Sequence, residues 1–467
     1  MVFSSLSFLL LFLPAALLIY FLSPRRARNA VLFIISLVFY AWGEPVYVVL
    51  MLFSTLTDYT IGRLMERWDA RPGLRRAALI ASLTINFGLL GFFKYSGLLV
   101  ETVNGLFSLS LPVPRIALPI GISFYTFQTL SYSIDVYRRN CPAQRNIISF
   151  GCYVAMFPQL IAGPIVRYID VCDALEHRRE TWEGFYSGTG RFLCGMVKKV
   201  LLANGIGQLW EQAAAISPAS LSTLTAWLGA FAYAFQIYFD FSGYSDMAIG
   251  LGRMFGFTFP ENFNYPYISR SVTDFWRRWH ITLSTWFREY LYIPLGGNRV
   301  SPVRKVVNLL IVWLATGLWH GASWNFLAWG GYFGILLVLE KYAFRGAIEK
   351  LPAWLGRVLT GLLVLVGWVF FAHDSLADGA QYLLAMLGGG GSFVSGGTLR
   401  LLLDYLPLLL LCALAATPLG KTAFTCLTAS RPRLRSALTA LLMLLGFALM
   451  LTYVVNAGYN PFLYFRF

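Results

Sequence analysis

Long apolar stretches alternate with short polar and basic segments from one end of the 467-residue chain to the other. A membrane-spanning helix needs roughly 20 mostly apolar residues to cross about 30 Å of hydrocarbon, and about twelve stretches approach that length. They lie at residues 1–23, 30–43, 46–62, 77–93, 116–136, 185–210, 221–241, 306–320, 324–340, 357–371, 401–418 and 436–454. Because no long hydrophilic segment separates them, the pattern predicts an all-α, polytopic membrane protein that forms one membrane-embedded domain over residues 1–467.

Two regions depart from this pattern of spans. Residues 147–166 are apolar but contain Pro158, Gly163 and Pro164, and proline is strongly unfavourable inside a helix. Broken backbone at membrane depth is tolerated only against protein or a wet cavity, so we expect a re-entrant element there. Residues 242–300 mix aromatic with charged side chains, which predicts short amphipathic helices and loops that lie at the cytoplasmic interface or dip into the protein.

The composition and the charge agree with a membrane protein. Hydrophobic residues make up 57% of the chain and charged residues 13%, and the formal net charge is +15. Basic residues of membrane proteins gather in cytoplasmic loops beside anionic lipid, so the charge calls for no nucleic-acid partner. Arg25, Arg26 and Arg28 follow the first apolar stretch, whereas a signal peptide carries its positive charge before that stretch. We therefore expect a first span and membrane lipid as the partner of the basic loops.

His320 is the first candidate for chemistry among four histidines. It ends the apolar run NLLIVWLATGLWH and lies fifteen residues after Lys305, roughly 22 Å along a helix at about 1.5 Å per residue. Ionisable side chains at such depth are functional candidates, and a neutral histidine can accept a proton. The structural alternative is a neutral histidine bonded to a carbonyl or a Trp N–H. His177 and His373 are expected to be solvated surface residues.

His280 is the second candidate, within a predicted helix over 273–286. Arg277 and Arg278 come directly before Trp279 and His280, and guanidinium groups pair bidentately with phosphate. A coenzyme A-like donor is one ligand for this group. The alternative is an interfacial helix that Trp and Arg anchor at lipid headgroups.

The remaining polar residues do not identify a reaction, and several known catalytic motifs are absent. Asp240, Tyr244 and Asp246 lie at the edge of an apolar run and either bond to nearby arginines or face a polar tunnel. The chain has no GxSxG, HExxH or P-loop motif, and its six cysteines form no CxxC pair. We therefore expect no serine hydrolase, no metal site and no permanently bound cofactor.

Five segments together are similar to the membrane-bound O-acyltransferase (MBOAT) family, and within it to the bacterial alginate O-acetyltransferase branch. They are PIGISFYTFQTLSYSIDVYR (119–138), FPQLIAGPIVRY (157–168), YFDFSGYSDMAIGLGRMFGFTFPENFNYPY (238–267), TDFWRRWHITLSTWFREYLYIPLGGNR (273–299) and GLWHGASWNFLAWG (317–330). They cover much of 119–330. Residues 340–467 resemble the family mainly in hydropathy and in the aromatic end NPFLYFRF.

The resemblance implies a ring of transmembrane helices around a central tunnel, in a multi-pass protein of the bacterial inner membrane. The near-invariant histidine of the family falls on His320 and its second motif residue on His280. It implies that acetyl passes from a cytoplasmic thioester, acetyl-CoA, through the membrane to a hydroxyl group, with His320 as general base. The donor phosphates would lie near Arg277, Arg278 or Arg299, with Trp279 beside them.

The same resemblance implies two partners and one alternative function, and the predicted spans with their buried polar groups leave a second alternative function open. The acceptor would be an exported polysaccharide, reached directly or through a periplasmic esterase-like protein that relays acetyl. One alternative is transfer of D-alanyl or another acyl group to a cell-envelope polymer, since that branch of the family shares the histidine. The other alternative is a non-catalytic transporter of polysaccharide or lipid.

Overall fold

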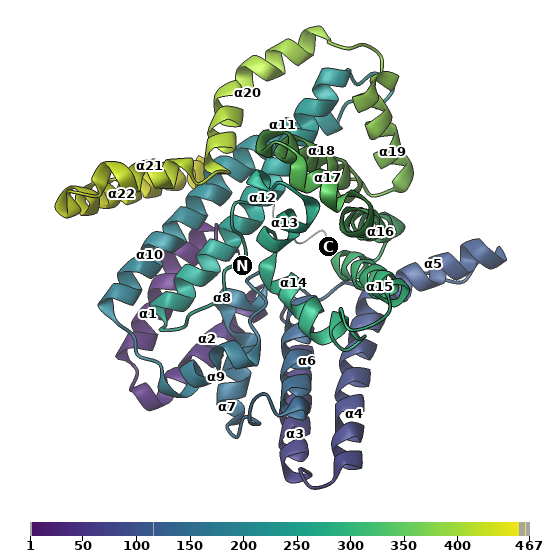
Figure 1. Cartoon of the computed structure of the whole chain (residues 1–467). Coiled ribbons are helices and arrows are strands. Elements are labelled where there is room, and N and C mark those ends of the chain that lie inside the picture. Colours follow the sequence, from purple (N-terminus) through teal and green to yellow (C-terminus); the bar gives the residue numbers. More distant parts are fainter. Residues whose placement is uncertain (1, 115, 457–462, 464–467) are drawn as a thin grey trace. The chain divides into compact units, whose positions relative to one another are not determined.

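The computed structural model describes residues 2–114, 116–456 and 463, and in these residues every regular element is helical. The chain forms two compact units (Figure 1). Unit 1 comprises Met1–Phe192 and Tyr244–Pro260, and unit 2 comprises Leu193–Gly243 and Glu261–Phe467. Of the aromatic end NPFLYFRF, only Leu463 lies among the described residues.

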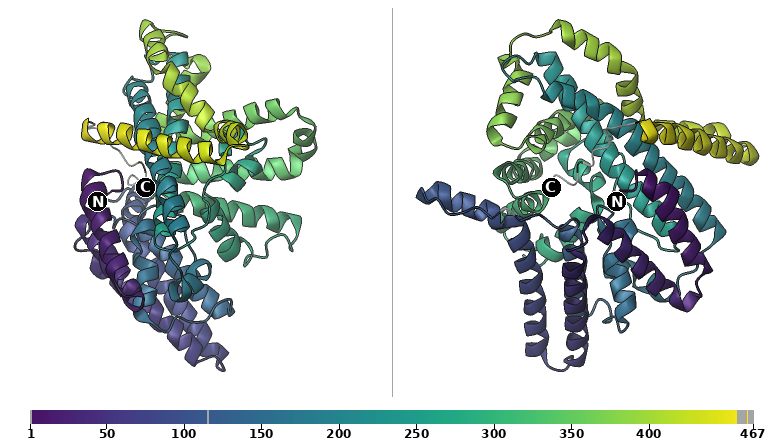
Figure 2. Two further views of the ribbon diagram at one scale, coloured as in Figure 1. Left: turned by 90° about the vertical axis from the view of Figure 1, so that its left-hand side faces the viewer. Right: turned by 180° about the vertical axis from the view of Figure 1, so that it is seen from behind.

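Unit 1 is built from the N-terminal helices. They are η1 (Phe8–Phe12), α1 (Leu13–Leu22), η2 (Arg25–Ala27), α2 (Arg28–Gly43), α3 (Val48–Arg67), α4 (Pro72–Leu90), η3 (Gly91–Tyr95), α5 (Ser96–Phe107), α6 (Ile122–Arg138), α7 (Ile147–Ala155), α8 (Phe157–Leu160), α9 (Tyr168–His177) and most of α10 (Trp182–Val197). The paired helices α3 and α4 stand out in the right-hand view of Figure 2. Asp58 of α3 joins them to α6, because its carboxylate accepts hydrogen bonds from Ser82, Asn86 and Ser133.

Unit 2 carries the later helices and both candidate histidines. They are η4 (Lys198–Ala203), α11 (Asn204–Ala214), the first part of α12 (Thr223–Met254), η5 (Pro266–Ile268), α13 (Val272–Arg278), α14 (Ile281–Phe287), η6 (Arg288–Tyr292), α15 (Pro302–His320), α16 (Trp324–Leu339), η7 (Glu340–Phe344), α17 (Arg345–Lys350), α18 (Ala353–Ala372), α19 (Leu376–Leu384), η8 (Ala385–Gly389), α20 (Gly396–Ala415), α21 (Leu419–Thr428) and α22 (Pro432–Asn456). The boundary between the units falls within α10 and within α12.

Each of the twelve stretches predicted as spans overlaps a helix or a run of helices, although α6 begins only at Ile122 in the stretch 116–136. Among the described residues, six helices are long and apolar enough to cross a membrane, namely Val48–Arg67, Pro72–Phe107, Pro302–His320, Ala353–Ala372, Gly396–Ala415 and Pro432–Asn456. The described part of the chain is thus all helical in its regular elements, and these apolar helices suit a multi-pass membrane protein. The number of twelve crossings and the central tunnel stay predictions.

The prediction for the beginning of 242–300 was wrong. Residues 242–254 continue the long helix α12 rather than forming separate short helices, and most of their polar side chains are buried, as one of the two predicted placements allows. Asp246, for example, is ion-paired with Arg191 of α10, with Oδ1 and Nη2 2.6 Å apart. The predicted break within 147–166 is confirmed: α7 ends at Ala155, and α8 begins at Phe157 with Pro158 in its first turn.

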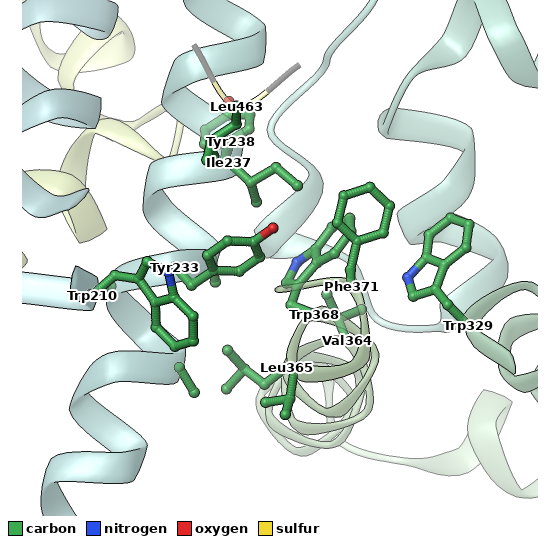
Figure 3. Packing of buried hydrophobic residues seen from close by; sticks show 14 of the residues in the cluster. Trp210, Tyr233, Ile237, Tyr238, Trp329, Val364, Leu365, Trp368, Phe371 and Leu463 are labelled. Carbon is green, nitrogen blue, oxygen red and sulfur yellow. The ribbon is translucent and has the colours of Figure 1, made fainter. Parts of the chain in front are cut away.

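A cluster of buried aromatic side chains forms the core of unit 2 (Figure 3). The residues labelled there come from α11, α12, α16, α18 and the C-terminal segment: Trp210, Tyr233, Ile237, Tyr238, Trp329, Val364, Leu365, Trp368, Phe371 and Leu463. The indole of Trp368 donates to the hydroxyl of Tyr267 at 3.1 Å, so this ring satisfies its polar group while its apolar body is buried. Trp329 and Phe371 are the members of this cluster that lie next to the C-terminal end of α15.

Candidate active site

Close packing of α15 against α16 fixes the position of His320. The N-terminus of α15 is capped by Ser301, with Pro302 in the first turn, and the helix ends at His320. A Cβ atom at Gly317 would lie 2.3 Å from the carbonyl oxygen of Phe326, and one at Gly330 would lie 2.4 Å from that of Trp313. Only glycine permits the two helix backbones to approach this closely.

Aromatic rings surround His320. Its ring centroid lies 5.0 Å from that of Trp319, 5.1 Å from that of Trp329 and 5.2 Å from that of Phe371. The residue is only 6% exposed. These rings and its low exposure shield His320 from bulk water.

His280 lies in the break between α13 and α14, so the prediction of one helix over 273–286 was wrong. Its φ of 45° and ψ of 53° fall in the left-handed region, which ends α13 and starts α14 in a new direction. Nδ1 of His280 lies 3.0 Å from Oδ1 of Asn262. Burial, and secondarily the nearby His320, lower the pKa of His280 well below its usual value, so the ring is neutral.

The two histidines lie side by side. Their ring centroids are 6.5 Å apart, with the ring planes inclined at 61°. The ring of His280 also lies 4.7 Å from that of Phe241 and 5.9 Å from that of Trp319. Two imidazoles thus meet in a buried, aromatic part of unit 2, although they are separated by forty residues of sequence.

An open cavity of about 830 Å³ reaches His280 from the surface of unit 2. Its buried lining includes Trp276, His280, Leu283, Trp313 and Thr316. On α15 the lining residues run from Leu309 to Thr316, and His320 lies one helical turn further along the same face. The inner end of the cavity is therefore next to the histidine pair.

The mouth of the cavity is positively charged. Its exposed lining contains four basic residues and one acidic residue: Arg277, Arg288, Lys341, Arg345 and Glu349. A second carboxylate, that of Glu340, accepts hydrogen bonds from the backbone N–H groups of Val272 and Thr273 at the start of α13. Arg277 forms no ion pair with any described residue. Positive charge at the mouth of a cleft attracts an anionic ligand.

The structure brings together some of the predicted binding residues and not others. Arg277 lines the cavity. Arg278 is ion-paired with Asp274 at 2.8 Å, and Arg299 is exposed; neither lines the cavity. Trp279 is buried, with its ring stacked 5.6 Å from that of Phe275, and it supports the core rather than the cavity.

Three basic residues of the mouth were missed. Arg288 lies within the resembling segment 273–299 but was not singled out, and Lys341 and Arg345 lie beyond the last resembling segment, where no sequence spacing connects them with Arg277. The high positive charge of the segments that follow apolar runs could have pointed to these residues. We explained that charge by binding to anionic lipid headgroups.

The other polar candidates lie elsewhere. His177 is exposed, with Nδ1 3.2 Å from a carboxylate oxygen of Asp173, as predicted for a surface residue. The same prediction was wrong for His373, which is half-buried because its Nδ1 bonds to the carbonyl oxygen of Val369 at 2.8 Å and its ring packs on Tyr382.

The acidic groups on α12 form ion pairs, with an arginine as predicted for Asp246 and with a lysine for Asp240. Asp240 pairs with Lys199 at 2.6 Å within unit 2, and Asp246 pairs with Arg191 within unit 1. Tyr244 stacks on Phe3, with ring centroids 4.6 Å apart. These residues hold helices together.

Comparison with known proteins identifies the class of this site. The model of the membrane-bound O-acyltransferase family matches residues 121–371, a range that contains both histidines. The chain belongs to the MBOAT family. It is therefore an O-acyltransferase, and the alternative of a non-catalytic transporter is not supported.

Curated relatives give the branch of the MBOAT family. The chain is 46% identical over 394 residues to the probable alginate O-acetylase AlgI of Azotobacter vinelandii, covering 84% of this chain and 79% of that protein. It is 34% identical over 427 residues to the peptidoglycan O-acetyltransferase of Helicobacter pylori, covering 84% and 80% of the two chains. Similarity to the teichoic acid D-alanyltransferase of Streptococcus thermophilus is weaker, at 28% over 47% of this chain and 56% of that protein.

Proposed function

We propose that this MBOAT protein transfers acetyl from cytoplasmic acetyl-CoA, through the membrane, to a hydroxyl group on an exported polysaccharide or on a periplasmic relay protein. The observation that carries the proposal is the cavity that runs from a basic mouth to His280, with His320 one turn beyond its inner end. A donor with an anionic nucleotide and a slender acyl-bearing arm matches that distribution of charge and depth.

The donor phosphates bind at the mouth. Arg277, Lys341 and Arg345 supply guanidinium and ammonium donors from three different helices, and Arg288 adds a fourth charge. The thioester arm extends past Trp276 and Trp313 to the histidine pair. The mouth faces the cytoplasm, because the segment 288–305 around it is rich in basic residues, as cytoplasmic loops are.

His320 acts as the general base. It takes the proton from the acceptor hydroxyl as that oxygen attacks the carbonyl carbon of the thioester. The C–S bond then breaks, and the imidazolium returns the proton to the departing thiolate, so that free coenzyme A and an acetyl ester result. A positioned general base contributes about 10²–10⁴-fold to the rate. No covalent intermediate on the protein is needed.

The acceptor enters from the opposite side of the membrane. We infer a ring of about twelve spans around a central tunnel, in which donor and acceptor meet at His320. The similarity to alginate and peptidoglycan O-acetyltransferases supports an acetyl group and a cell-envelope polysaccharide, with alginate as the first candidate. A periplasmic esterase-like protein would carry acetyl onward to the polymer, and the protein would reside in the bacterial inner membrane.

A second candidate is transfer of D-alanyl to a cell-envelope polymer. It is supported by the similarity to D-alanyltransferases, which is lower in identity and covers less of the chain. A D-alanyl donor carries an additional ammonium group next to the thioester. The inner lining of the cavity contains no carboxylate among the described residues to bind that ammonium group, so acetyl is favoured.

Release of free coenzyme A by detergent-purified protein tests the proposal. Acetyl-CoA is supplied with an oligosaccharide acceptor or the candidate relay protein, for the wild type, His320→Ala and His177→Ala. We expect release by the wild type and by the His177 variant, whose substituted residue is exposed, and loss of release in a monodisperse His320 variant. Equal release by all three proteins would remove His320 from the mechanism. Release only from a D-alanyl donor would favour the second candidate.

A further inference from the structure

Asn262 contacts His280 from a segment that the mechanism above does not use. Its Oδ1 lies 3.0 Å from Nδ1 of His280, 3.3 Å from the backbone nitrogen of Thr282 and 2.9 Å from the hydroxyl of Thr282. All three residues are at most 5% exposed. One carboxamide oxygen therefore serves as acceptor for groups on both sides of the turn between α13 and α14.

These contacts determine which nitrogen of His280 carries the proton. The backbone nitrogen of Thr282 is always a donor, so the atom of Asn262 that faces it must be the oxygen. That oxygen has no proton to give, and Nδ1 of the neutral imidazole must then donate its own. Nε2 is consequently left with a lone pair. It is buried and has no hydrogen-bond partner among the described residues.

The backbone of Asn262 is also joined to the residue that follows His280. The N–H of Ile281 donates to the carbonyl oxygen of Asn262 at 3.0 Å. His280 has a left-handed backbone conformation, which costs a residue with a Cβ atom about 1–2 kcal/mol and persists only where the surroundings enforce it. Asn262 therefore constrains His280 through both its main chain and its side chain.

We propose that Asn262 is a positioning residue that holds His280 as the Nδ1-protonated tautomer, so that Nε2 accepts a hydrogen bond from a substrate hydroxyl at the inner end of the cavity. The second half of this statement rests on the proposed acyl transfer, whereas the tautomer does not. The role of His280 becomes distinct from that of His320: His280 orients the hydroxyl group, and His320 takes its proton.

The groups that face His280 allow the proposal to be tested by titration. His320 of α15 is the titratable neighbour; α12 presents Phe241, and the 261–263 segment presents Asn262, neither of which titrates. Arg277 and Arg288 line the same cavity nearer its mouth. A carboxylate in place of the carboxamide would still accept from Nδ1 but would favour the protonated ring.

The first test is the ¹⁵N NMR spectrum of histidine-labelled protein in lipid bilayers, with the four histidines assigned by single substitutions. We expect the wild-type His280 signal to be that of the Nδ1-protonated tautomer, whether or not acyl transfer is observed. A wild-type signal from the Nε2-protonated tautomer would overturn the proposal without the use of any variant. Failure of the acyl-transfer proposal would leave this signal unchanged, so the two failures are distinguishable.

Two substitutions then separate positioning from folding. Asn262→Leu should mix the tautomers and lower kcat by about 10–100-fold, the range found when partners that orient metal-bound histidines are removed. Asn262→Asp should retain the tautomer, recover most of kcat, and move the titration of His280 and the acidic limb of the activity profile to higher pH. Asn264→Leu, an exposed control two residues away, should change none of these. An Asn262→Leu protein with wild-type kcat and tautomer would disprove the positioning role, as would an Asn262→Asp protein with an unshifted His280 titration.

Discussion

Thr316 and His320 lie one helical turn apart on α15, with Thr316 in the lining of the cavity and His320 in contact with the ring of His280. The hydroxyl of Thr316 is already bonded to the carbonyl oxygen of Val312 at 2.8 Å. Its small side chain therefore contributes space rather than a hydrogen bond to substrate. Thr316 is the last residue of α15 in the cavity lining before His320.

Thr316→Phe should close the passage without removing any group that takes part in the chemistry. Because a small misplacement of the reacting groups can cost about 10²-fold, we expect kcat/KM to fall by roughly 10–100-fold. Steady-state release of coenzyme A measures the effect. Leu314→Phe is the control, since Leu314 is an exposed residue of the same helix. Full activity of the Thr316 variant would show that the donor does not approach along this face of α15.

The basic mouth predicts a dependence on the nucleotide part of the donor. Arg277→Ala and Lys341→Ala should each raise KM for acetyl-CoA by roughly two- to fivefold with little change in kcat, as expected for exposed charges that bind phosphate. Added salt should raise the wild-type KM towards that of the variants.

Acetyl-pantetheine, which lacks the nucleotide, provides the internal control for that prediction. Its KM should be the same in the wild type and in both variants. Arg304→Ala should leave the KM of either donor unchanged, since Arg304 is exposed and does not line the cavity. A rise in KM for both donors alike would place Arg277 and Lys341 outside the nucleotide site.

The sequence predicted those features of the site that depend on a single segment. His320 was identified because an ionisable side chain ends a long apolar run, and α15 lies where that run was found. The broken backbone near Pro158 followed from the conformational limits of proline. Both inferences use only local chemistry, which the tertiary structure leaves unchanged.

Features that depend on several segments were not predicted. The cavity joins Arg277 to Lys341 and Arg345 across more than sixty residues, and no periodicity encodes that contact. Asn262 was not singled out, because an asparagine in a loop is usually interpreted as a turn residue. The continuation of α12 through Asp246 was missed because its ion pair with Arg191 offsets the charge that made the segment look interfacial.

The close approach of α15 and α16 predicts that one glycine is far more sensitive than its neighbour. A Cβ atom at Gly330 would meet the carbonyl oxygen of Trp313 at 2.4 Å, whereas one at Gly331 would meet only a side-chain carbon of Leu314 at 3.8 Å. Gly330→Ala should therefore lower the free energy of unfolding by about 1–3 kcal/mol and displace His320, with loss of activity. Gly331→Ala should leave stability unchanged or improve it by up to about 1 kcal/mol, since alanine is the better helix former. Thermal unfolding in detergent, together with release of coenzyme A, checks both; equal effects of the two substitutions would contradict the packing argument.

The ion pair between Lys199 and Asp240 makes the strongest prediction for stability. Its atoms Nζ and Oδ1 are 2.6 Å apart, and the two side chains are 3% and 4% exposed. Asp240 also accepts a hydrogen bond from the backbone N–H of Leu463 at 2.9 Å. Removal of one charge leaves the other buried without compensation, which costs about 3–5 kcal/mol, whereas replacing both charges with apolar groups of similar size is far less harmful.

Asp240→Asn should thus lower the unfolding temperature strongly, and the double variant Lys199→Met with Asp240→Leu should recover much of the loss. The hydrogen bond to Leu463 is absent from the double variant, so recovery should be incomplete. Arg400 and Asp404 of α20 form a control pair that is 85% and 59% exposed, and Asp404→Asn should change stability by less than about 1 kcal/mol. Thermal unfolding of the four proteins in one detergent compares them directly. If the double variant were no more stable than Asp240→Asn, the loss would come from the contact with Leu463 or from packing, and the uncompensated charge of Lys199 would not be its cause.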